Sequence, residues 1–586
     1  MNREPGERGH SAETVKTVDS PAESRVRVAR SSKRLMTNGV VLMAGAALLS
    51  KLIGVFQKIP LQNLAGDRVF GIYNAVYPFY QLAAVLATAG LPTAVSLLIA
   101  ERLRKGDDPE GVRRTLYAAL LLLGITGIAA FGFMWSGADR AAGWIGDSET
   151  AGAIRSVSFA LLLAPFVAAL RGYTQGLGRM GLSAASQVAE QMIRVAVMLF
   201  VLALGWSAGW GESTVAAGVM SGSAFGACAS LAVLAFYLWR GRRRGRLSSK
   251  AGMLRAELKK LAAIALPVAL GAVVVPVLGV VDAFMVPRLL QAGGASEGGS
   301  LALFGIYSRA QPLVQLVVMV AGAAAAALVP GLALARMRGA YGQLRVQLAF
   351  VERAAWAIGA AAAIGLAMLA GPLNIMLYQD SAGTYAFALV GCTALAGSVN
   401  AITAPVLQGL GAVRIPALLL LAAALLKGVL NAVLVPLYGI EGAAIAGITA
   451  LTAAALLGTI AVRYKAAEAG ASLAGSWKER RSAGVKRRRP LLSNAAAGTG
   501  LALAVMAAAL AVAERALGAA LGGLPPRAAA AALALTCVAV GACAFGAAAL
   551  RGGALSAREL RALPGGGVLA ARLQRWRIMP RARDEG

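Results

Sequence analysis

Residues 70–100 read FGIYNAVYPFYQLAAVLATAGLPTAVSLLIA, 31 residues without a single Asp, Glu, Lys or Arg. A helix needs about 20 consecutive apolar residues to cross the hydrocarbon core of a bilayer. Over the whole chain, apolar residues make up 58% and charged residues 14%, whereas a soluble domain is roughly a quarter charged. Ala, Leu and Gly dominate the apolar segments, without the alternation of a membrane β-barrel. The sequence therefore predicts an all-α integral membrane protein.

About fourteen apolar segments follow one another along the chain, and each is expected to be one transmembrane helix. They cover residues 37–57, 70–100, 112–135, 154–173, 183–206, 213–239, 258–282, 301–332, 350–372, 383–405, 415–436, 441–463, 493–513 and 527–550. Lys and Arg concentrate in the two tails and in every second loop, while the intervening loops are short and lean acidic. This positive-inside pattern predicts a multi-pass protein of the cytoplasmic membrane with both termini in the cytoplasm. It also accounts for the net charge of +30 without a nucleic-acid partner.

The chain repeats itself. The sequence FGIY at residues 70–73 recurs at 304–307, an offset of 234, and QGLG at 175–178 recurs at 408–411, an offset of 233. Six segments separate the copies, and this even number predicts two parallel six-helix repeats. A pair of such repeats with a binding site between them is a common plan of transporters.

The pattern predicts a domain organisation in which the last two helices lie outside the repeat. It consists of a disordered cytoplasmic tail (1–36), an N-terminal six-helix lobe (37–240), a basic linker (241–257), a C-terminal six-helix lobe (258–463), a basic loop (464–492), two additional helices (493–550) and a basic tail (551–586).

Ionisable side chains inside the apolar segments are costly, so each is a candidate functional residue. The candidate cations are Lys51, Lys58, Arg194, Arg309 and Lys427, and the candidate acids are Glu190 and Asp282. The excess of cations favours an anionic ligand. The alternative for Lys51 and Arg309 is a side chain that reaches the membrane interface.

Glu190 and Arg194 are four residues apart with the acid first, the favourable order for an ion pair on one helix. The pair is either part of a site or a self-neutralising structural element. At the offset of 233, Arg194 corresponds to Lys427, but Glu190 corresponds to Ala423. Lys427 is therefore expected to lack a local partner.

Asp282 ends the seventh segment, where it either couples transport to a cation or proton or pairs with Arg309 or Arg288.

Pro78 and Pro312 correspond at the offset of 234. Because a proline inside a helix removes a hydrogen bond and bends it, these two are candidate hinges of a rocking bundle, or tolerated irregularities.

Motifs of soluble enzymes lack their structural context. GLGRMG at 176–181 fits the dinucleotide-binding pattern but follows a membrane segment instead of a strand. The chain has no phosphate-binding loop, its four cysteines lie in apolar segments, and its single histidine, His10, lies in the polar tail. We therefore expect no enzymatic activity, no cofactor and no metal site.

Several stretches resemble polysaccharide-biosynthesis flippases, namely the stage V sporulation protein B group and MurJ-type lipid II flippases of Gram-positive bacteria. These belong to the multidrug/oligosaccharidyl-lipid/polysaccharide exporter superfamily. The stretches are SKLIG (50–54), PLQNLAGD (60–67), FGIYNAVYPFY (70–80), LATAGLPTAVS (86–96), RGYTQG (171–176) and SQVAEQMIRV (186–195).

The resemblance implies two lobes that form a V around a central cationic cavity, and two extra helices that line a groove for a lipid tail. It implies that Lys51 and Arg309 are cations of that cavity. Arg171 and Glu190 match the family pattern either as site or as structure. The second helix departs from Gram-negative members, which have arginine where this chain has Tyr73, Tyr77 and Tyr80.

These features predict a flippase that moves an undecaprenyl-pyrophosphate-linked glycan, such as lipid II or a related spore-envelope or surface glycan, by alternating access. Membrane lipid is an expected partner, and cell-wall synthesis enzymes are candidate partners. A drug or cation exporter of the same superfamily is the first alternative, although it would favour acidic residues in the cavity. A membrane-embedded glycan polymerase is the second, although it would need a carboxylate placed for acid–base chemistry.

Overall fold

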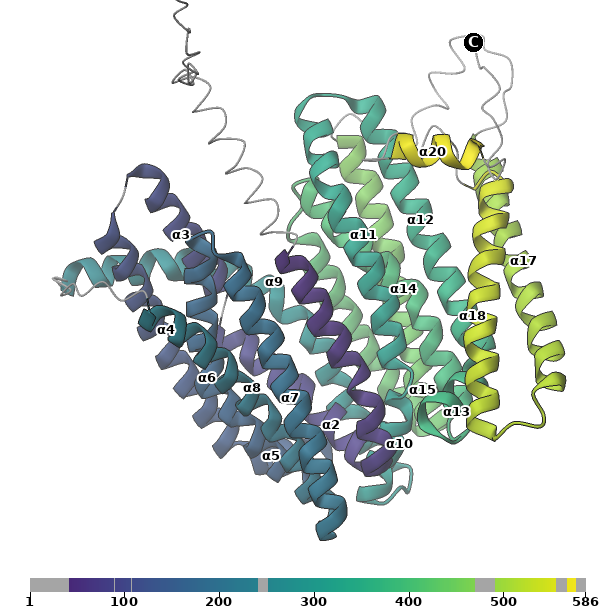
Figure 1. Cartoon of the computed structure of the whole chain (residues 1–586), viewed down its shortest axis with the longest axis horizontal. Helices are drawn as coiled ribbons and strands as arrows, with labels where there is room; N and C mark the ends of the chain where they lie inside the picture. Colours follow the sequence, from purple (N-terminus) through teal and green to yellow (C-terminus); the bar gives the residue numbers. More distant parts are fainter. Residues whose placement is uncertain are drawn as a thin grey trace, which may run out of the picture.

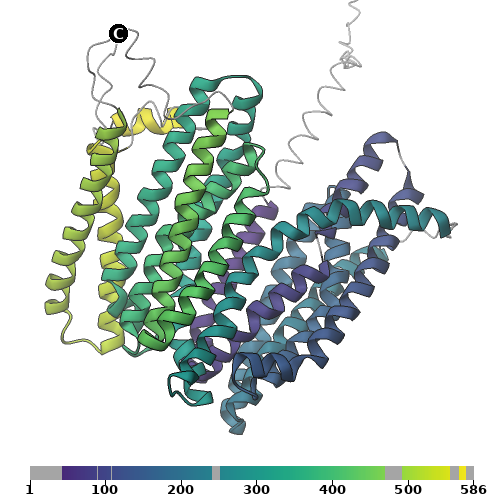
Figure 2. The same ribbon diagram turned by 180° about the vertical axis from the view of Figure 1, so that it is seen from behind.

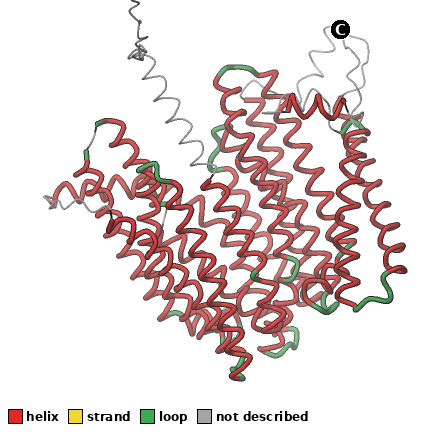
Figure 3. The backbone as a smooth tube through the Cα atoms, viewed as in Figure 1, coloured by secondary structure: helices red, strands yellow, loops and turns green. Residues whose placement is uncertain are grey.

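The computed structural model describes residues 42–88, 90–106, 108–240, 251–468, 491–554 and 566–575. The predicted tail 1–36 lies outside these residues, as do most of the loop 464–492 and parts of the linker 241–257 and the tail 551–586. Within the described residues all regular structure is helical, as Figure 3 shows. The all-helical, multi-pass character predicted from composition is confirmed.

The first described helix covers residues 42–56. The helices that follow are α2 (Lys58–Thr88), α3 (Leu91–Lys105), α4 (Pro109–Ser136), α5 (Ala138–Ile145), α6 (Thr150–Gly176), α7 (Met180–Ala208), α8 (Glu212–Arg240), α9 (Ala251–Ala292), α10 (Glu297–Ser308), α11 (Gln311–Met337), α12 (Tyr341–Met368), α13 (Ala370–Tyr378), α14 (Thr384–Gly409), α15 (Ile415–Glu468), α17 (Leu491–Ala520), α18 (Pro526–Arg551) and α20 (Gly566–Arg575).

Eleven helical stretches of the described residues are long and apolar enough to cross a membrane, fewer than the fourteen expected. Two stretches, 42–105 and 415–468, hold two predicted segments each, and the seventh predicted segment, 258–282, lies in α9, which is not among the eleven. At about 1.5 Å per residue, the 54 residues of α15 would be far longer than a bilayer is thick. The helix instead bends at Gly439, where φ is 60° and ψ is −136°. Gly66 interrupts α2 in the same way, with φ 81° and ψ 175°.

The helices form two bundles (Figures 1 and 2). The N-terminal bundle contains α3 to α8, and the C-terminal bundle contains α11 to α15. Helices α2, α9 and α10 lie between them, and α17 and α18 pack on the outside against α12 and α13. The bundles diverge toward the end formed by the C-terminus of α3 and the α11–α12 turn. We call this the basic end, because its loops carry the clustered Lys and Arg, and the opposite end the acidic end.

The apolar core is continuous at the acidic end and divided at the basic end. One large cluster includes Phe70 and Ile145 from the N-terminal half and Phe304 and Phe387 from the C-terminal half. Toward the basic end, a cluster with Ile99 and another with Leu407 are separate. The bundles are therefore joined at the acidic end and independently packed at the basic end.

The repeated FGIY motifs meet where α2 crosses α10. A Cβ on Gly71 would overlap the carbonyl oxygen of Leu301, and a Cβ on Gly305 would overlap that of Asp67. Each glycine thus contacts the residue four positions before its counterpart, so the crossing is symmetric under the offset of 234. Glycine is required here because it allows two helix backbones to approach closely.

Candidate functional site

Arg171, Glu190 and Arg194 form a charged cluster in the N-terminal bundle, which we call the N-lobe cluster. Arg171 Nη2 donates to Glu190 Oε2 at 2.7 Å, and Arg194 Nη2 donates to Glu190 Oε1 at 3.1 Å. Arg171 also donates to the hydroxyls of Ser186 and Ser230. The pairing of Glu190 with Arg194 follows from their spacing on α7, whereas Arg171 comes from α6. One carboxylate shared by two guanidinium groups leaves the cluster with a net positive charge.

A row of tyrosines on α2 connects this cluster to the first helix. Arg194 Nη1 donates to Tyr77 Oη at 3.4 Å, and the rings of Tyr77 and Tyr73 stack with centroids 5.3 Å apart. Gln57 Nε2 donates to Tyr73 Oη at 2.9 Å and accepts a hydrogen bond at its Oε1 from Gln191 Nε2 at 3.1 Å. Sequence reasoning placed the tyrosines in the second helix but missed that they join α7 to the first helix. Their recurrence at positions 73, 77 and 80, along one helix face, was the available signal.

Lys51 and Lys58 lie seven residues apart on the first helical path, before the bend at Gly66, and no described carboxylate pairs with either. Lys58 Nζ donates to Asn74 Oδ1 at 3.1 Å. Lys51 is exposed and forms no hydrogen bond or ion pair with any described residue. Lys58 was expected near the end of the first segment, but the helical path runs on to residue 65 before it bends at Gly66.

The candidate residues of the N-terminal half carry an excess of positive charge. Four of them are cations and one is a carboxylate: Lys51, Lys58, Arg171 and Arg194 against Glu190. Because an uncompensated charge at membrane depth is costly, this excess is the arrangement expected where an anion binds.

The C-terminal half contains a neutral counterpart, which we call the C-lobe cluster. Lys427 Nζ donates to Asp282 Oδ2 at 2.5 Å, and both side chains are buried. Tyr307 Oη donates to the same oxygen at 3.1 Å, and Asn431 Nδ2 donates to Asp282 Oδ1 at 3.3 Å. The prediction for Lys427 concerned a partner on its own helix, where Ala423 takes the place of Glu190. Its partner Asp282 lies on another helix, α9, at a sequence distance that helix spacing cannot reveal.

Arg309 does not lie beside these clusters but closes the acidic end. It sits between α10 and α11 with its side chain fully buried. Its guanidinium donates to both oxygens of Asp67, at 2.6 and 3.0 Å, and to both oxygens of Asp380, at 2.5 and 3.0 Å. Tyr378 donates to the Arg309 carbonyl at 2.7 Å. We call Asp67, Arg309 and Asp380 the Arg309 cluster. Its guanidinium holds the pKa of Asp380 below its usual range.

Further contacts at the acidic end were not predicted from the sequence. Arg68 pairs with Asp147, Glu149 and Glu212, at 3.2, 2.7 and 3.1 Å. Between the two halves, Gln291 Nε2 donates to the carbonyl of Gly146 at 2.5 Å. Together with the Arg309 cluster, these bonds fasten helix ends that lie far apart in the sequence.

The two candidate hinge prolines occupy different positions. Pro78 lies inside α2, next to Gly279 of α9. Pro312 lies in the first turn of α11, immediately after the break at Arg309, and not inside a continuous helix as expected. Proline is well accommodated in a first turn, where its missing N–H would have no helical partner.

The described residues contain no group of three His, Cys, Asp or Glu side chains that could hold a metal ion.

Two bundles of membrane helices, joined at one end and carrying ionised side chains inside, define the class of protein as a multi-pass transporter. The profile of the family described as "Polysaccharide biosynthesis protein" matches residues 36–335. YabM of Bacillus subtilis, an uncharacterised membrane protein, is 33% identical over 385 residues, which cover 65% of this chain and 71% of YabM. The lipid II flippase MurJ of the same organism is 27% identical over 404 residues, covering 65% and 73% of the two chains.

The chain belongs to the polysaccharide biosynthesis protein family, within the multidrug/oligosaccharidyl-lipid/polysaccharide exporter superfamily. Solved structures agree on the fold. A lipid II flippase MurJ in an inward closed conformation superimposes with a TM-score of 0.58 at 13% identity, covering 86% of this chain and 97% of that one. An inward-facing multidrug transporter of the MATE family gives 0.59 at 17% identity, covering 74% and 99%.

Proposed function

We propose that this protein is a flippase for an undecaprenyl-pyrophosphate-linked glycan, such as lipid II or a related cell-wall, spore-envelope or surface polysaccharide precursor. The observation that carries the proposal is the excess of positive charge at membrane depth in the N-terminal half, where Lys51 and Lys58 have no described carboxylate partner. The relation to MurJ of Bacillus subtilis supports a lipid-linked substrate.

A diphosphate suits these cations for chemical reasons. Ammonium and guanidinium groups form their strongest hydrogen bonds with charged oxygens, and a guanidinium can contact two oxygens at once. Lys51 and Lys58 are about 10 Å apart along the helix at 1.5 Å per residue, so they can contact different parts of one headgroup. Arg194 would turn to the substrate at the expense of its 3.4 Å bond to Tyr77. Arg171 would hold Glu190 in place.

The proposed cycle is alternating access. The divided core at the basic end lets the bundles separate there, while the Arg309 cluster and the hydrogen bond from Gln291 to the Gly146 carbonyl keep the acidic end closed. The headgroup enters from the basic end, which we take to be cytoplasmic. The isoprenoid tail stays in lipid along α17 and α18. Release then requires the acidic-end contacts to break and the basic end to close.

The C-lobe cluster is the proposed coupling element. The chain has no nucleotide-binding motif, so the drive would come from the membrane potential or an ion gradient. Asp282 is buried and bonded to Lys427, Tyr307 and Asn431. A cation or proton that took the place of Lys427 at this carboxylate would free the lysine for the substrate phosphate.

The same cluster weakens the drug-exporter alternative. An exporter of organic cations would need an embedded carboxylate that is available to its substrate. Asp282 is already neutralised by Lys427 at 2.5 Å, and Glu190 contacts two arginines. The MATE structure shares the fold, but at 17% identity it gives no basis for inferring the substrate of this chain.

The test is complementation of a bacterial strain depleted of its own lipid II flippase, with externally exposed lipid II as the readout. Wild type is expected to restore exposure. Lys51→Ala and Lys58→Ala are expected to abolish it at equal membrane abundance. Lys105→Ala, which alters an exposed ion pair at the basic end, is the matched control and should leave it unchanged.

Each failure has a distinct meaning. If wild type inserts but exposes no lipid II, the substrate is not lipid II, and the lipid precursors that accumulate in a deletion strain would identify the glycan. If wild type flips and both lysine variants flip equally well, the assignment of the cationic site is refuted while the transport function stands.

A further inference from the structure

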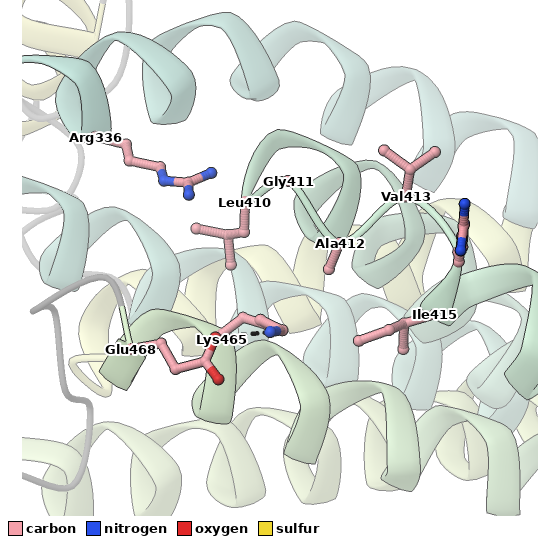
Figure 4. A pocket seen from close by; sticks show the side chains of 9 residues that line it. Arg336, Leu410, Gly411, Ala412, Val413, Ile415, Lys465 and Glu468 are labelled. Atoms are coloured by element: carbon pink, nitrogen blue, oxygen red, sulfur yellow. Dashed lines mark hydrogen bonds and ion pairs between the residues drawn. The ribbon is translucent and has the colours of Figure 1, made fainter.

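A cavity of about 670 Å³ opens at the basic end of the C-terminal bundle, away from the proposed substrate site. It lies between the end of α11, the turn that joins α14 to α15, and the end of α15 (Figure 4). Its charged lining comes from Arg336, Arg414, Lys465 and Glu468. This volume is within the range of small-molecule binding sites.

The cavity is positively charged. Three cations line it, against a single lining carboxylate, Glu468, which pairs with Lys465 at 2.6 Å. Neither Arg336 nor Arg414 forms an ion pair with a described residue. In Figure 4 the Arg336 guanidinium extends toward the turn at Leu410 and Gly411. A Cβ on Gly411 would lie 3.0 Å from Arg336 Nη1, so the glycine leaves room for this group.

The helix ends do not decide the charge of the cavity. The N-terminus of α15 lies in its wall at Ile415, but the C-terminal ends of α11, α14 and α15 line it as well. A helix N-terminus favours an anion, whereas a helix C-terminus favours a cation. The positive charge of the cavity therefore comes from its side chains.

The internal repeat shows that the unpaired charge is particular to this half. At the offset of 234, Arg336 corresponds to Arg102 of α3. Arg102 donates to Asp108 at 3.2 Å and to the buried Glu257 at 2.7 Å, so it is neutralised. The position that matches Asp108 is Gly342, which has no carboxylate. The same arginine is thus a structural ion-pair partner in one half and an available cation in the other.

We propose that this cavity binds the phosphate group of an anionic phospholipid from the leaflet at the basic end. A lipid is the favoured source because α15 carries a stripe of exposed apolar side chains beside the cavity. Leu418, Leu425 and Val429 are 63%, 67% and 65% exposed and recur on one helix face. Acyl chains can lie along this stripe while the headgroup phosphate contacts Arg336 and Arg414. The site is independent of the proposed flippase site and shares no residue with it.

The experiment uses the purified full chain in detergent, titrated with dioctanoyl phosphatidylglycerol and, separately, dioctanoyl phosphatidylcholine. Native mass spectrometry counts the bound lipid. Wild type is expected to bind the anionic lipid more tightly. Arg336→Gln and Arg414→Gln should each weaken that binding about fivefold, the effect of roughly one cation near a membrane surface. Arg338→Gln, a substitution at the same helix end but outside the cavity lining, should leave it unchanged.

Glu468→Gln provides a test that does not depend on losing a cation. It removes the lining carboxylate and should tighten phosphatidylglycerol binding. Equal binding of the two lipids by wild type, or unchanged binding in both arginine variants, would overturn the proposal. Inorganic phosphate that displaces the lipid at equal concentration would overturn the lipid source and identify a soluble phosphate as the ligand.

Discussion

Replacing Arg309 by Gln should loosen the closure of the acidic end. The guanidinium donates four hydrogen bonds to Asp67 and Asp380, and the side chain is fully buried. Removing one partner of a buried ion pair costs about 3–5 kcal/mol. Asp380 is 49% exposed and Asp67 22%, so solvent reduces this cost, since exposed pairs contribute only about 0–1 kcal/mol. We expect about 3 kcal/mol, which is roughly a 100-fold shift in the ratio of closed to open acidic ends.

The assay is pulsed electron paramagnetic resonance on a chain whose native cysteines have been replaced. One spin label at Arg140→Cys on α5 and one at Tyr385→Cys on α14 report the separation of the two halves, because both positions are exposed at the acidic end. Wild type should give a short, narrow distance distribution. The Arg309→Gln protein should add a longer component.

The matched control is Arg155→Gln. Arg155 pairs with Asp139 at 2.6 Å, also at the acidic end, but both residues belong to the N-terminal bundle. This substitution should leave the distance unchanged. If the Arg309→Gln protein inserts normally and its distance distribution matches that of wild type, the reasoning that this cluster holds the acidic end closed is refuted.

Three further predictions concern packing, charge and pH. Gly71→Ala should lower the thermal unfolding temperature in detergent, because its Cβ would overlap the backbone of α10. Gly132→Ala is the control and should leave this temperature unchanged, because no atom lies near its Cβ. Equal effects of the two substitutions would contradict the close contact of α2 with α10. Lys427→Met should destabilise the chain by about 3–5 kcal/mol because it leaves a buried carboxylate unpaired, and adding Asp282→Asn should restore most of this in a double-mutant cycle; additive losses would show that the two groups do not interact. The lowered pKa of Asp380 means that its pairing stabilises the fold above its ordinary value of 3.8 and is lost as pH falls through the lower folded value. The spin-label distance should therefore stay constant between pH 7 and pH 5, and a change there would assign the closure to other groups.

Much of the fold follows from the sequence because a backbone in lipid must satisfy its hydrogen bonds within regular secondary structure. Long apolar segments must be helices, and the matching FGIY motifs revealed a repeat whose copies prove to pack against each other. The ends of the helices were less predictable. The first apolar segment was expected to end at residue 57, but polar residues beyond it, Lys58, Gln62 and Asn63, remain in the helical path. These side chains find partners in Asn74, Asp67 and the carbonyl of Leu377, which allow polar residues to stay helical.

The candidate site was predictable in its residues but not in its pairings. Helix spacing predicts the ion pair of Glu190 with Arg194, since both lie on one face of α7. It cannot predict the ion pair of Asp282 with Lys427, because that contact depends on how α9 packs against α15. For Arg309, the sequence signalled an unusual charge but not that the chain breaks there and places it between two carboxylates.

The crossing of α2 and α10 has a mechanical consequence. Gly71 and Gly305 bring the two backbones into contact near the acidic end, while α2 extends another 17 residues to Thr88. That arm is about 25 Å long at 1.5 Å per residue. If the halves turn about this contact, a rotation of about 10° moves the far end of the arm by roughly 4 Å. The two glycines would then act as a pivot, at which a small rotation beside the Arg309 cluster becomes a displacement of several ångströms at the other surface.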